Sequence, residues 1–435
     1  MGKTGLSCAR FLAARGEHVM FVDTRSAPPA LAAIRELLPA AVTHCGPVAK
    51  DALLGARRII VSPGVPLDHP ALVAAAACGI AIAGDVELFA QAARAPVIAI
   101  TGSNGKSTVT TLVGEILAAD GKRVAAGGNL GTPALDLLSD PEPDCYVLEL
   151  SSFQLETTHS LAARVGAILN VSPDHLDRHK SLEAYAAAKA RVLNDASVAV
   201  LNADDPIVAV LGGRARSTLT VSLEPDAPAN YGVVTRLDGL WLAQDGEPVL
   251  AVSELGIKGR HNVFNALAAL ALTDAAGAAR SAQCAVLKRF QGLPHRCNLV
   301  AEKLGVTWYD DSKGTNVGAS AAAIAGIFAD RQGVLIAGGQ GKGADFAELA
   351  AALPDRVHTV VLIGEDAARI AAAIGTLAAV RHAGSMREAV AIAASAARPG
   401  DAVLLSPACA SFDMFDDYEH RGREFVAAVA AELGS

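Results

Sequence analysis

A short segment rich in glycine, serine and threonine carries one lysine between an apolar strand and a helix. It follows the apolar run from Val97 to Ile100. Glycines let backbone N–H groups converge on phosphate oxygens, and a helix N-terminus adds a favourable dipole. A lysine here can reach terminal phosphates, and the next serine can bind magnesium. A surface turn would not need this strand–loop–helix setting. The residues predicted to hold a nucleotide are Gly102, Ser103, Asn104, Gly105, Lys106, Ser107 and Thr108.

Acidic and histidine side chains follow two further apolar strands. Glu149 lies near the end of one of them, and Asp174 and His175 follow the next. Ligands collect at the carboxyl edge of doubly wound sheets. Glu149 is therefore a candidate magnesium ligand, and His175 a candidate ligand or substrate contact. The alternatives are a strand-edge carboxylate and a structural histidine.

Short apolar strands alternate with alanine- and leucine-rich helices nearly throughout the chain. This alternation predicts an α/β protein with parallel sheets covered by helices. The strands expected are Val19–Val22, Ile59–Ser62, Val97–Thr101, Tyr146–Leu150, Ala167–Val171, Val334–Ala337, Val360–Gly364 and Val403–Ser406. The helices expected are Leu31–Leu38, Ser107–Ala119, Leu182–Asn194 and Asn262–Ala276.

A chain of 435 residues is too long for one hydrophobic core. We expect three domains, with boundaries at 1–86, 87–292 and 293–435. The first and third are expected to be Rossmann-like, and the second to be a P-loop-type ATP-binding domain. Residues 218–252 contain short runs, glycine and proline, which predicts a small β-rich excursion on the second domain.

Composition excludes several classes of partner. The net charge of -8 argues against a nucleic-acid or anionic-membrane surface. Seven scattered cysteines without a CxxC pair fit reduced thiols in a cytoplasmic protein. The apolar runs are too short to span a membrane, and no signal peptide is apparent. We expect a cytoplasmic monomer that acts on small molecules.

Several motifs together resemble those of one enzyme family. The phosphate loop has Ile100 where the usual motif has glycine. Residues 310–316 are similar to the family's Asp-Ser-Lys-Ala-Thr-Asn segment, with Gly314 in place of alanine. Residues 292–296 are similar to its hinge, and residues 406–411 to the segment of its D-glutamate-adding members. On these motifs the chain resembles the bacterial Mur ligases over nearly its whole length.

The resemblance implies an ATP-dependent amide-bond ligase of peptidoglycan precursor synthesis. Such an enzyme adds D-glutamate to UDP-N-acetylmuramoyl-L-alanine through an acyl phosphate, with two magnesium ions. Lys189 alone would be a surface lysine, but the resemblance implies that carbon dioxide carbamylates it into an anionic magnesium ligand. The implied catalytic residues are Lys106, His175, Lys189 and Lys313, and the implied metal ligands are Ser107, Glu149, His175 and carbamylated Lys189.

The resemblance also implies binding residues beyond the phosphate loop. Those near the nucleotide are Asn262, Asn265, Arg296 and Asp311, although the two asparagines could equally cap a helix. Those near the amino acid are Thr315, Lys342, Ser411 and Tyr418, where family members often carry phenylalanine at the last position. Those near the UDP-linked substrate are Thr4, Asp23, Thr24, Arg25, Ser62, Gly64, Asn129, Ser151 and Gln154. Cys409 is expected to be a packing residue, because no base is paired with it.

Four alternatives stay open at this stage. The chain could add a different amino acid, or it could be a folylpolyglutamate synthetase, which lacks a UDP-binding domain. A dinucleotide-binding oxidoreductase would need a G-x-G-x-x-G motif, which is absent from the first block. A P-loop binding protein without ligase activity is the fourth. The family's first strand and its glycines are expected before Gly2 and are not in the chain, which predicts either an upstream start or a damaged UDP site.

Overall fold

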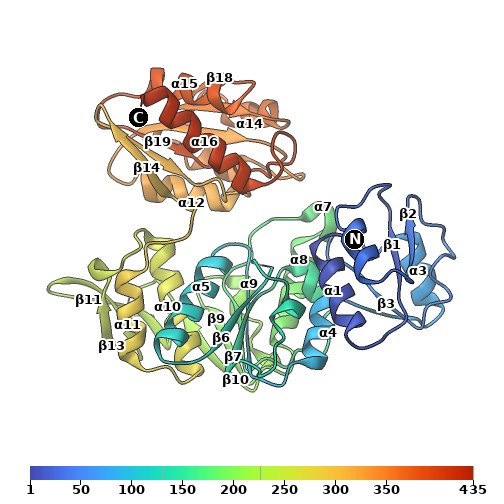
Figure 1. Cartoon of the computed structure of the whole chain (residues 1–435). Helices are drawn as coiled ribbons and strands as arrows, with labels where there is room; N and C mark the ends of the chain where they lie inside the picture. Colours follow the sequence, from blue (N-terminus) through green and yellow to red (C-terminus); the bar gives the residue numbers. More distant parts are fainter. Residues whose placement is uncertain (130, 226, 435) are drawn as a thin grey trace. The chain divides into compact units, whose positions relative to one another are not determined.

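The computed structural model describes residues 1–129, 131–225 and 227–434. It divides into two compact units (Figure 1). Unit 1 comprises Met1–Val171, Glu183–Glu254 and Phe264–Lys288. Unit 2 comprises Ser172–Leu182, Leu255–Val263 and Arg289–Ser435. Among the described residues, no helix is both long enough and apolar enough to cross a membrane.

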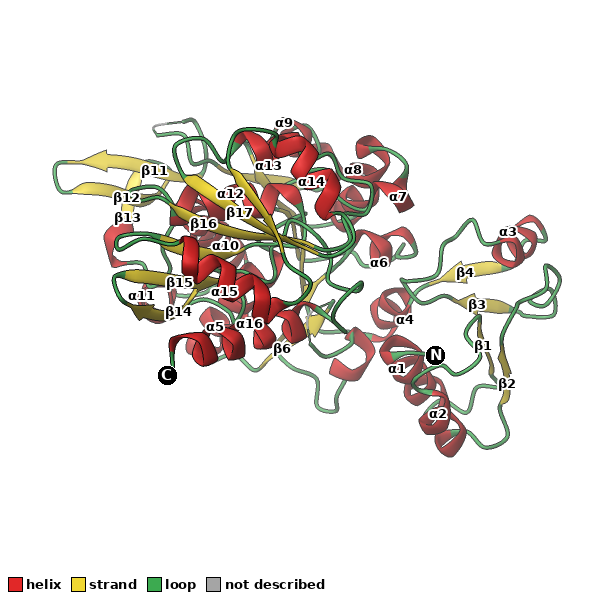
Figure 2. Cartoon of the chain, turned by 90° about the horizontal axis from the view of Figure 1, so that it is seen from above, coloured by secondary structure: helices red, strands yellow, loops and turns green. Residues whose placement is uncertain are grey.

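The N-terminal part of unit 1 contains two small sheets. Strand β1 pairs in parallel with β2, and β3 pairs in parallel with β4, each as a separate two-stranded sheet (Figure 2). Ile34 is fully buried beside the first sheet and Leu72 is nearly so beside the second, so each sheet has a small core of its own. The elements are α1 (Lys3–Ala13), β1 (Met20–Asp23), α2 (Leu31–Leu37), β2 (Val42–Cys45), β3 (Arg58–Ile60), α3 (Pro70–Ala77), β4 (Ala81–Ala83) and α4 (Asp85–Ala92).

A nine-stranded sheet forms the rest of unit 1. Its order is β13-β12-β11-β10-β9-β8-β5-β7-β6, parallel from β6 to β11 and antiparallel from there to β13. The strands are β5 (Val97–Thr101), β6 (Val124–Gly128), β7 (Cys145–Glu149), β8 (Val165–Ile168), β9 (Val198–Asn202), β10 (Ser217–Val221), β11 (Tyr231–Arg236), β12 (Gly239–Gln244) and β13 (Glu247–Ala251). Strands β5 and β7 are buried at every position, as expected for strands covered on both faces.

Helices and 3-10 turns connect these strands, and η4, α10 and α11 follow the last of them. They are α5 (Lys106–Ala119), η1 (Ala134–Leu137), α6 (Ser152–Glu156), α8 (Leu182–Ala190), η2 (Arg191–Leu193), α9 (Pro206–Ala209), η3 (Gly212–Arg214), η4 (Val252–Glu254), α10 (Arg260–Ala275) and α11 (Arg280–Arg289). The expected β-rich excursion is confirmed, and β10 to β13 extend the large sheet instead of forming a separate one. The last turn of the helix expected over 182–194 is a 3-10 turn.

Unit 2 is built on a six-stranded sheet with the order β14-β15-β19-β16-β17-β18, in which only β14 is antiparallel. The strands are β14 (Asn298–Lys303), β15 (Val306–Asp310), β16 (Gly333–Gly338), β17 (Val357–Ile363), β18 (Ala379–His382) and β19 (Ala402–Leu405). The helices are α7 (Leu176–His179), α12 (Val317–Ile327), α13 (Ala347–Ala351), α14 (Ala367–Ile374), α15 (Met386–Ala396) and α16 (Tyr418–Leu433). Helices α12 to α14 pack on one face, and α15 and α16 on the other.

Candidate active site

The phosphate loop of unit 1 joins the central strand β5 to α5, as the sequence predicts. Gly105 has φ +83° and precedes the helix, and a Cβ atom there would lie 2.6 Å from Asn265 Oδ1. Asn104 N–H donates to Asn170 Oδ1 at 2.7 Å, and Asn170 Nδ2 donates back to the Asn104 carbonyl at 3.1 Å. The loop is thus held from the α10 side and from the segment after β8, and only glycine fits at its last turn.

Two lysine side chains converge on one carbonyl of this loop. Lys106 Nζ donates to the Gly102 carbonyl at 2.8 Å and to the Ser103 carbonyl at 3.0 Å. Lys189 Nζ donates to the same Gly102 carbonyl at 2.7 Å and lies 4.3 Å from the centre of the Tyr185 ring. Lys189 is 1% exposed, so it is not the surface lysine that its helix alone would suggest.

Glu149 lies beside the phosphate loop. In the parallel register, Ile100 of β5 pairs with Glu149 of β7, and Gly128 of β6 pairs with Glu149 from the other side. Asn129 Nδ2 donates to Glu149 Oε1 at 2.6 Å. The second oxygen, Oε2, is buried and has no hydrogen-bond partner among the described residues. A buried carboxylate oxygen without a donor is costly unless a cation meets it, so this oxygen fits a magnesium ligand.

The predicted substrate residues of unit 1 have partners of their own. Ser151 and Gln154 form a capping box at the start of α6, with Gln154 N–H 3.2 Å from Ser151 Oγ. Arg25 donates two hydrogen bonds to the Asp23 carboxylate, from Nε at 2.9 Å and from Nη2 at 2.8 Å. The amino group of Met1 also donates to Asp23. These Arg25 hydrogen bonds hold the pKa of Asp23 well below its ordinary value. Thr24 and Gly64 are exposed, and Thr4 and Ser62 are half-buried.

A second group of predicted residues lies in unit 2, including His175, which follows β8 by several residues. Lys342 Nζ donates to Asp174 Oδ1 at 3.3 Å, and Asn316 Nδ2 donates to Asp174 Oδ2 at 3.3 Å. Asp174 is therefore bound by the glycine-rich loop after β16 and by the loop after β15. Its segment, Ser172–Leu182, belongs to unit 2.

Asp311 is buried in unit 2. Ser406 Oγ donates to Asp311 Oδ2 at 2.7 Å. Burial raises the pKa of Asp311 to about 7, and the neighbouring charge of Asp310 acts in the same direction. Among the helix asparagines, Asn262 Nδ2 donates to the Lys258 carbonyl at 2.8 Å, and Asn265 lies well inside α10. Neither asparagine is an N-cap in the structure.

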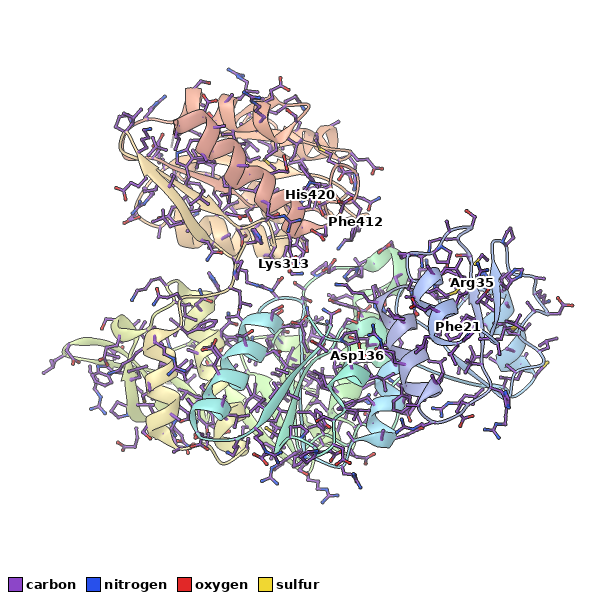
Figure 3. All side chains as sticks on the ribbon, viewed as in Figure 1. Phe21, Arg35, Asp136, Lys313, Phe412 and His420 are labelled. Atoms are coloured by element: carbon purple, nitrogen blue, oxygen red, sulfur yellow. The ribbon has the colours of Figure 1, made fainter. Side chains whose placement is uncertain are left out.

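Of the residues predicted to meet the amino acid, Thr315 lies in the loop after β15, and Tyr418 begins α16. Lys313 Nζ lies 3.8 Å from the centre of the Tyr418 ring, which begins α16. Lys313, Phe412 and His420 lie on the same side of unit 2 (Figure 3). Ser411 is 2% exposed, and Thr315 N–H donates to the Lys313 carbonyl at 2.8 Å. Cys409 is buried in the core of unit 2, which confirms that it is a packing residue.

Sequence reasoning missed four side chains that hold these groups in place. They are Asn170 and Tyr185 in unit 1 and His295 and Arg421 in unit 2. Tyr185 precedes Lys189 by four residues, so a helical spacing could have drawn attention to it. Arg421 is fully buried and donates to the carbonyls of Ser312 at 2.8 Å and Cys409 at 3.1 Å. Nothing in its local sequence signals that burial.

Comparison with known proteins supplies the decisive observation. Residues 1–84 match the model for a Mur ligase MurD-like N-terminal domain, 100–273 a Mur ligase middle domain, and 295–409 a Mur ligase glutamate ligase domain. A UDP-N-acetylmuramoylalanine--D-glutamate ligase of Nitrosococcus oceani is 52% identical over 99% of this chain and 95% of that protein. The chain belongs to the Mur ligase family. The ligase of the same name from Pseudomonas aeruginosa is 51% identical over 99% of this chain and 96% of that protein.

Solved structures agree with the Mur ligase fold. The UDP-N-acetylmuramate-alanine ligase of Thermotoga maritima has a TM-score of 0.63 at 20% identity and covers 99% of this chain and 98% of that chain. A Mycobacterium tuberculosis folylpolyglutamate synthase has a TM-score of 0.59 at 18% identity and covers 78% of this chain and 91% of that chain. At these identities the likeness concerns the fold. The expected fold class, α/β with parallel-dominated sheets, is confirmed.

Proposed function

We propose that this Mur ligase joins D-glutamate to UDP-N-acetylmuramoyl-L-alanine at the expense of ATP. The observation that carries the proposal is the similarity, over 99% of the chain, to ligases with that name. The terminal carboxylate of the UDP-linked substrate attacks the γ-phosphorus of ATP, which forms an acyl phosphate and releases ADP. The amine of D-glutamate then attacks the acyl carbon, and collapse of the tetrahedral intermediate forms the amide and releases phosphate and a proton.

The phosphate loop supports the first step. We assign nucleotide binding to its backbone N–H groups and to Lys106, which would exchange its carbonyl partners for phosphate oxygens. Glu149 and Ser107 would hold magnesium, and Oε2 of Glu149 is the oxygen without a donor. Magnesium, when bound, would neutralise charge on the phosphates. Lys189 would join this set only after carbamylation, because its ammonium group would repel a cation.

Unit 2 supports the second step. We assign the carboxylates of D-glutamate to Lys342, with Ser411, Thr315 and Tyr418 as further contacts. Lys313 would stabilise developing negative charge, and His175 would orient or deprotonate the amine. Asp311, Arg296 and Asn262 would meet the nucleotide, together with Asn265 of unit 1. These assignments follow the Mur ligase motifs.

The three-domain division, 1–86, 87–292 and 293–435, is part of the proposal. The first would bind the UDP moiety through Thr4, Asp23, Thr24, Arg25, Ser62 and Gly64. Asn129, Ser151 and Gln154 would contact the same substrate from the second domain. The enzyme would act in the cytoplasm, because ATP and UDP-linked precursors are made there. We also propose that it acts as a monomer.

The test is phosphate release from ATP with magnesium, UDP-N-acetylmuramoyl-L-alanine and a panel of amino acids. We expect release only when the UDP-substrate and D-glutamate are both present. Equal release with a different amino acid would change the assigned co-substrate. Release with a folate and L-glutamate, and none with the UDP-substrate, would overturn the proposal in favour of a folylpolyglutamate synthetase.

A further inference from the structure

A buried aspartate, Asp310, connects His295 to the loop 311–316, which carries the proposed reactive groups Lys313 and Thr315. Asp310 is the last residue of β15 and is 2% exposed. One carboxylate oxygen lies 2.6 Å from His295 Nδ1, and the other accepts the Ser312 N–H at 2.9 Å. A carboxylate only accepts hydrogen bonds, so Nδ1 of His295 carries the proton. The two oxygens of Asp310 therefore accept hydrogen bonds from two different segments, one from His295 and one from Ser312.

His295 lies near the start of the last segment of unit 2, Arg289–Ser435, and is held tightly there. Its backbone is left-handed, with φ +61°, and its carbonyl accepts the Lys313 N–H at 3.0 Å. Its ring lies directly against Gly422 of α16, where a Cβ atom would be 2.2 Å from Nδ1. Gly422 is a buried helical residue, so a side chain at this position would have to displace the ring.

The same loop is held from α16 on its other side. Ser312 Oγ donates to the Tyr418 carbonyl at 2.7 Å, and Arg421 Nε donates to Ser312 Oγ at 3.0 Å. The ring of Tyr418 meets the ring of His295 edge to face, with their centroids 6.4 Å apart, and also lies under Lys313 Nζ. His295, the loop after β15 and α16 therefore form one packed group around Asp310.

We propose that Asp310 is a positioning residue, which fixes the loop 311–316 by clamping His295 and the Ser312 N–H with one buried carboxylate. The clamp sets the direction of Lys313 and Thr315 without touching a substrate. Gly422 is its second requirement, because it leaves room for the His295 ring. The kinetic part of this inference rests on the proposed function, whereas the structural part does not.

Four variants test the clamp. Asp310→Leu removes both acceptors at similar size, and Gly422→Ala pushes on the ring from the helix side. Asp310→Asn is the conservative variant, because its oxygen can keep the Ser312 N–H while its NH₂ donates to the other histidine tautomer. Gly326→Ala is the matched control, since a Cβ atom at that helical position in α12 meets nothing within 4 Å.

We expect Asp310→Leu and Gly422→Ala each to lower kcat by about tenfold to a hundredfold, as displaced catalytic groups do. The KM for D-glutamate should rise as well, while the affinity for the UDP-substrate, measured by calorimetry, stays unchanged. Asp310→Asn should keep most of the activity, and Gly326→Ala all of it. Adding His295→Ala to Gly422→Ala should cause no loss beyond that of His295→Ala alone, because the methyl group then has room.

A readout without activity separates this inference from the proposed function. In amide hydrogen exchange, the peptide covering residues 311–316 should lose protection in Asp310→Leu and Gly422→Ala, and keep it in Gly326→Ala. Unchanged protection, or a fall in kcat with every KM unchanged, would overturn the clamp, because an inactive fraction alone produces the second pattern. If Asp310→Leu fails to fold, Gly422→Ala and its double variant decide. Absence of phosphate release in the wild type would count against the function only.

Discussion

Lys106 and Lys189 place two ammonium groups on a single carbonyl oxygen, that of Gly102. Lys189 is buried, and its aliphatic stem packs in the interior of unit 1. A fixed positive charge there would oppose magnesium beside Glu149. Reaction of the neutral amine with carbon dioxide would give a carbamate and a proton, and would replace the hydrogen-bond donor by an oxygen ligand.

We predict that Lys189→Ala is nearly inactive and that acetate partly restores turnover. The alanine leaves space for a short carboxylate, whose oxygens replace those of the carbamate. Phosphate release at increasing acetate concentration measures the rescue. Lys288→Ala is the control, since that lysine is about half exposed and pairs with Glu254 on the surface. Equal acetate response in both variants would speak against the carbamate.

Asp311 gives a prediction for stability against pH. Burial raises its pKa from the ordinary value of 3.8 to about 7 in the folded protein. The folded state therefore binds more protons than the unfolded state between these two values. Its contribution to the free energy of unfolding is largest below the unfolded pKa, falls as pH rises through this window, and is constant above it.

Asp311→Asn should remove this slope. Urea unfolding of both proteins at about pH 5 and about pH 8 measures it, because the difference between them isolates the one carboxyl group. We expect the wild type to lose more stability than Asp311→Asn between the two conditions. Parallel behaviour of the two proteins would show that Asp311 is not titrating in this range.

Among the secondary-structure elements, the junction of β5 and α5 depends on a glycine. Gly105→Ala would place a methyl group on Asn265 and would force φ +83° on an alanine. We predict a loss of about 1–3 kcal/mol of stability, together with weaker ATP binding. Gly114→Ala in the same helix is the control, because its Cβ would make only an ordinary contact of 3.6 Å with Ala126. Urea unfolding and nucleotide titration compare the two, and equal effects would contradict the prediction.

The strands that lie inside a sheet were predictable from sequence, because burial on both faces leaves a continuous apolar run. Strand β5 matches its expected range, and β16, β17 and β19 agree within a few residues. The strand expected over 167–171 ends instead at Ile168, since the polar Asn170 side chain binds the phosphate loop. Strands β6 and β18 were not predicted, because alanine, glycine and charged residues interrupt their apolar pattern.

The site was predictable where the residue types and spacing of one short motif indicate its chemistry, as in the loop from Gly102 to Thr108. It was not predictable where partners come from distant segments. Asp174 meets Lys342 across more than a hundred residues of sequence, and Arg421 reaches Ser312 in the same way. Hydrogen bonds of this kind depend on how the sheets bring distant loops together, so the sequence around each residue does not predict them.

For the molecule as a whole, stability is expected to be uneven. The N-terminal part of unit 1 relies on two separate two-stranded sheets with strands of three or four residues. Two-stranded sheets are marginal in isolation and need packing from helices. We predict that limited proteolysis cuts first within residues 14–84, and that the UDP-substrate slows this cutting. Mass spectrometry of the first fragments measures it. First cuts within β5 to β9 would contradict the prediction.

The contact between Gly422 and His295 also has a consequence for how related sequences can vary. A side chain at position 422 would occupy the space of the His295 ring, so positions 295 and 422 cannot change independently. Wherever relatives keep histidine at position 295, we expect glycine at 422 and an oxygen-bearing side chain at 310. Lineages that replace the histidine are released from the requirement for glycine at 422, whereas an acceptor at 310 is still needed by the Ser312 N–H. Substitutions at 295 and 422 should therefore appear together on the same branches, although the two positions are far apart in the chain.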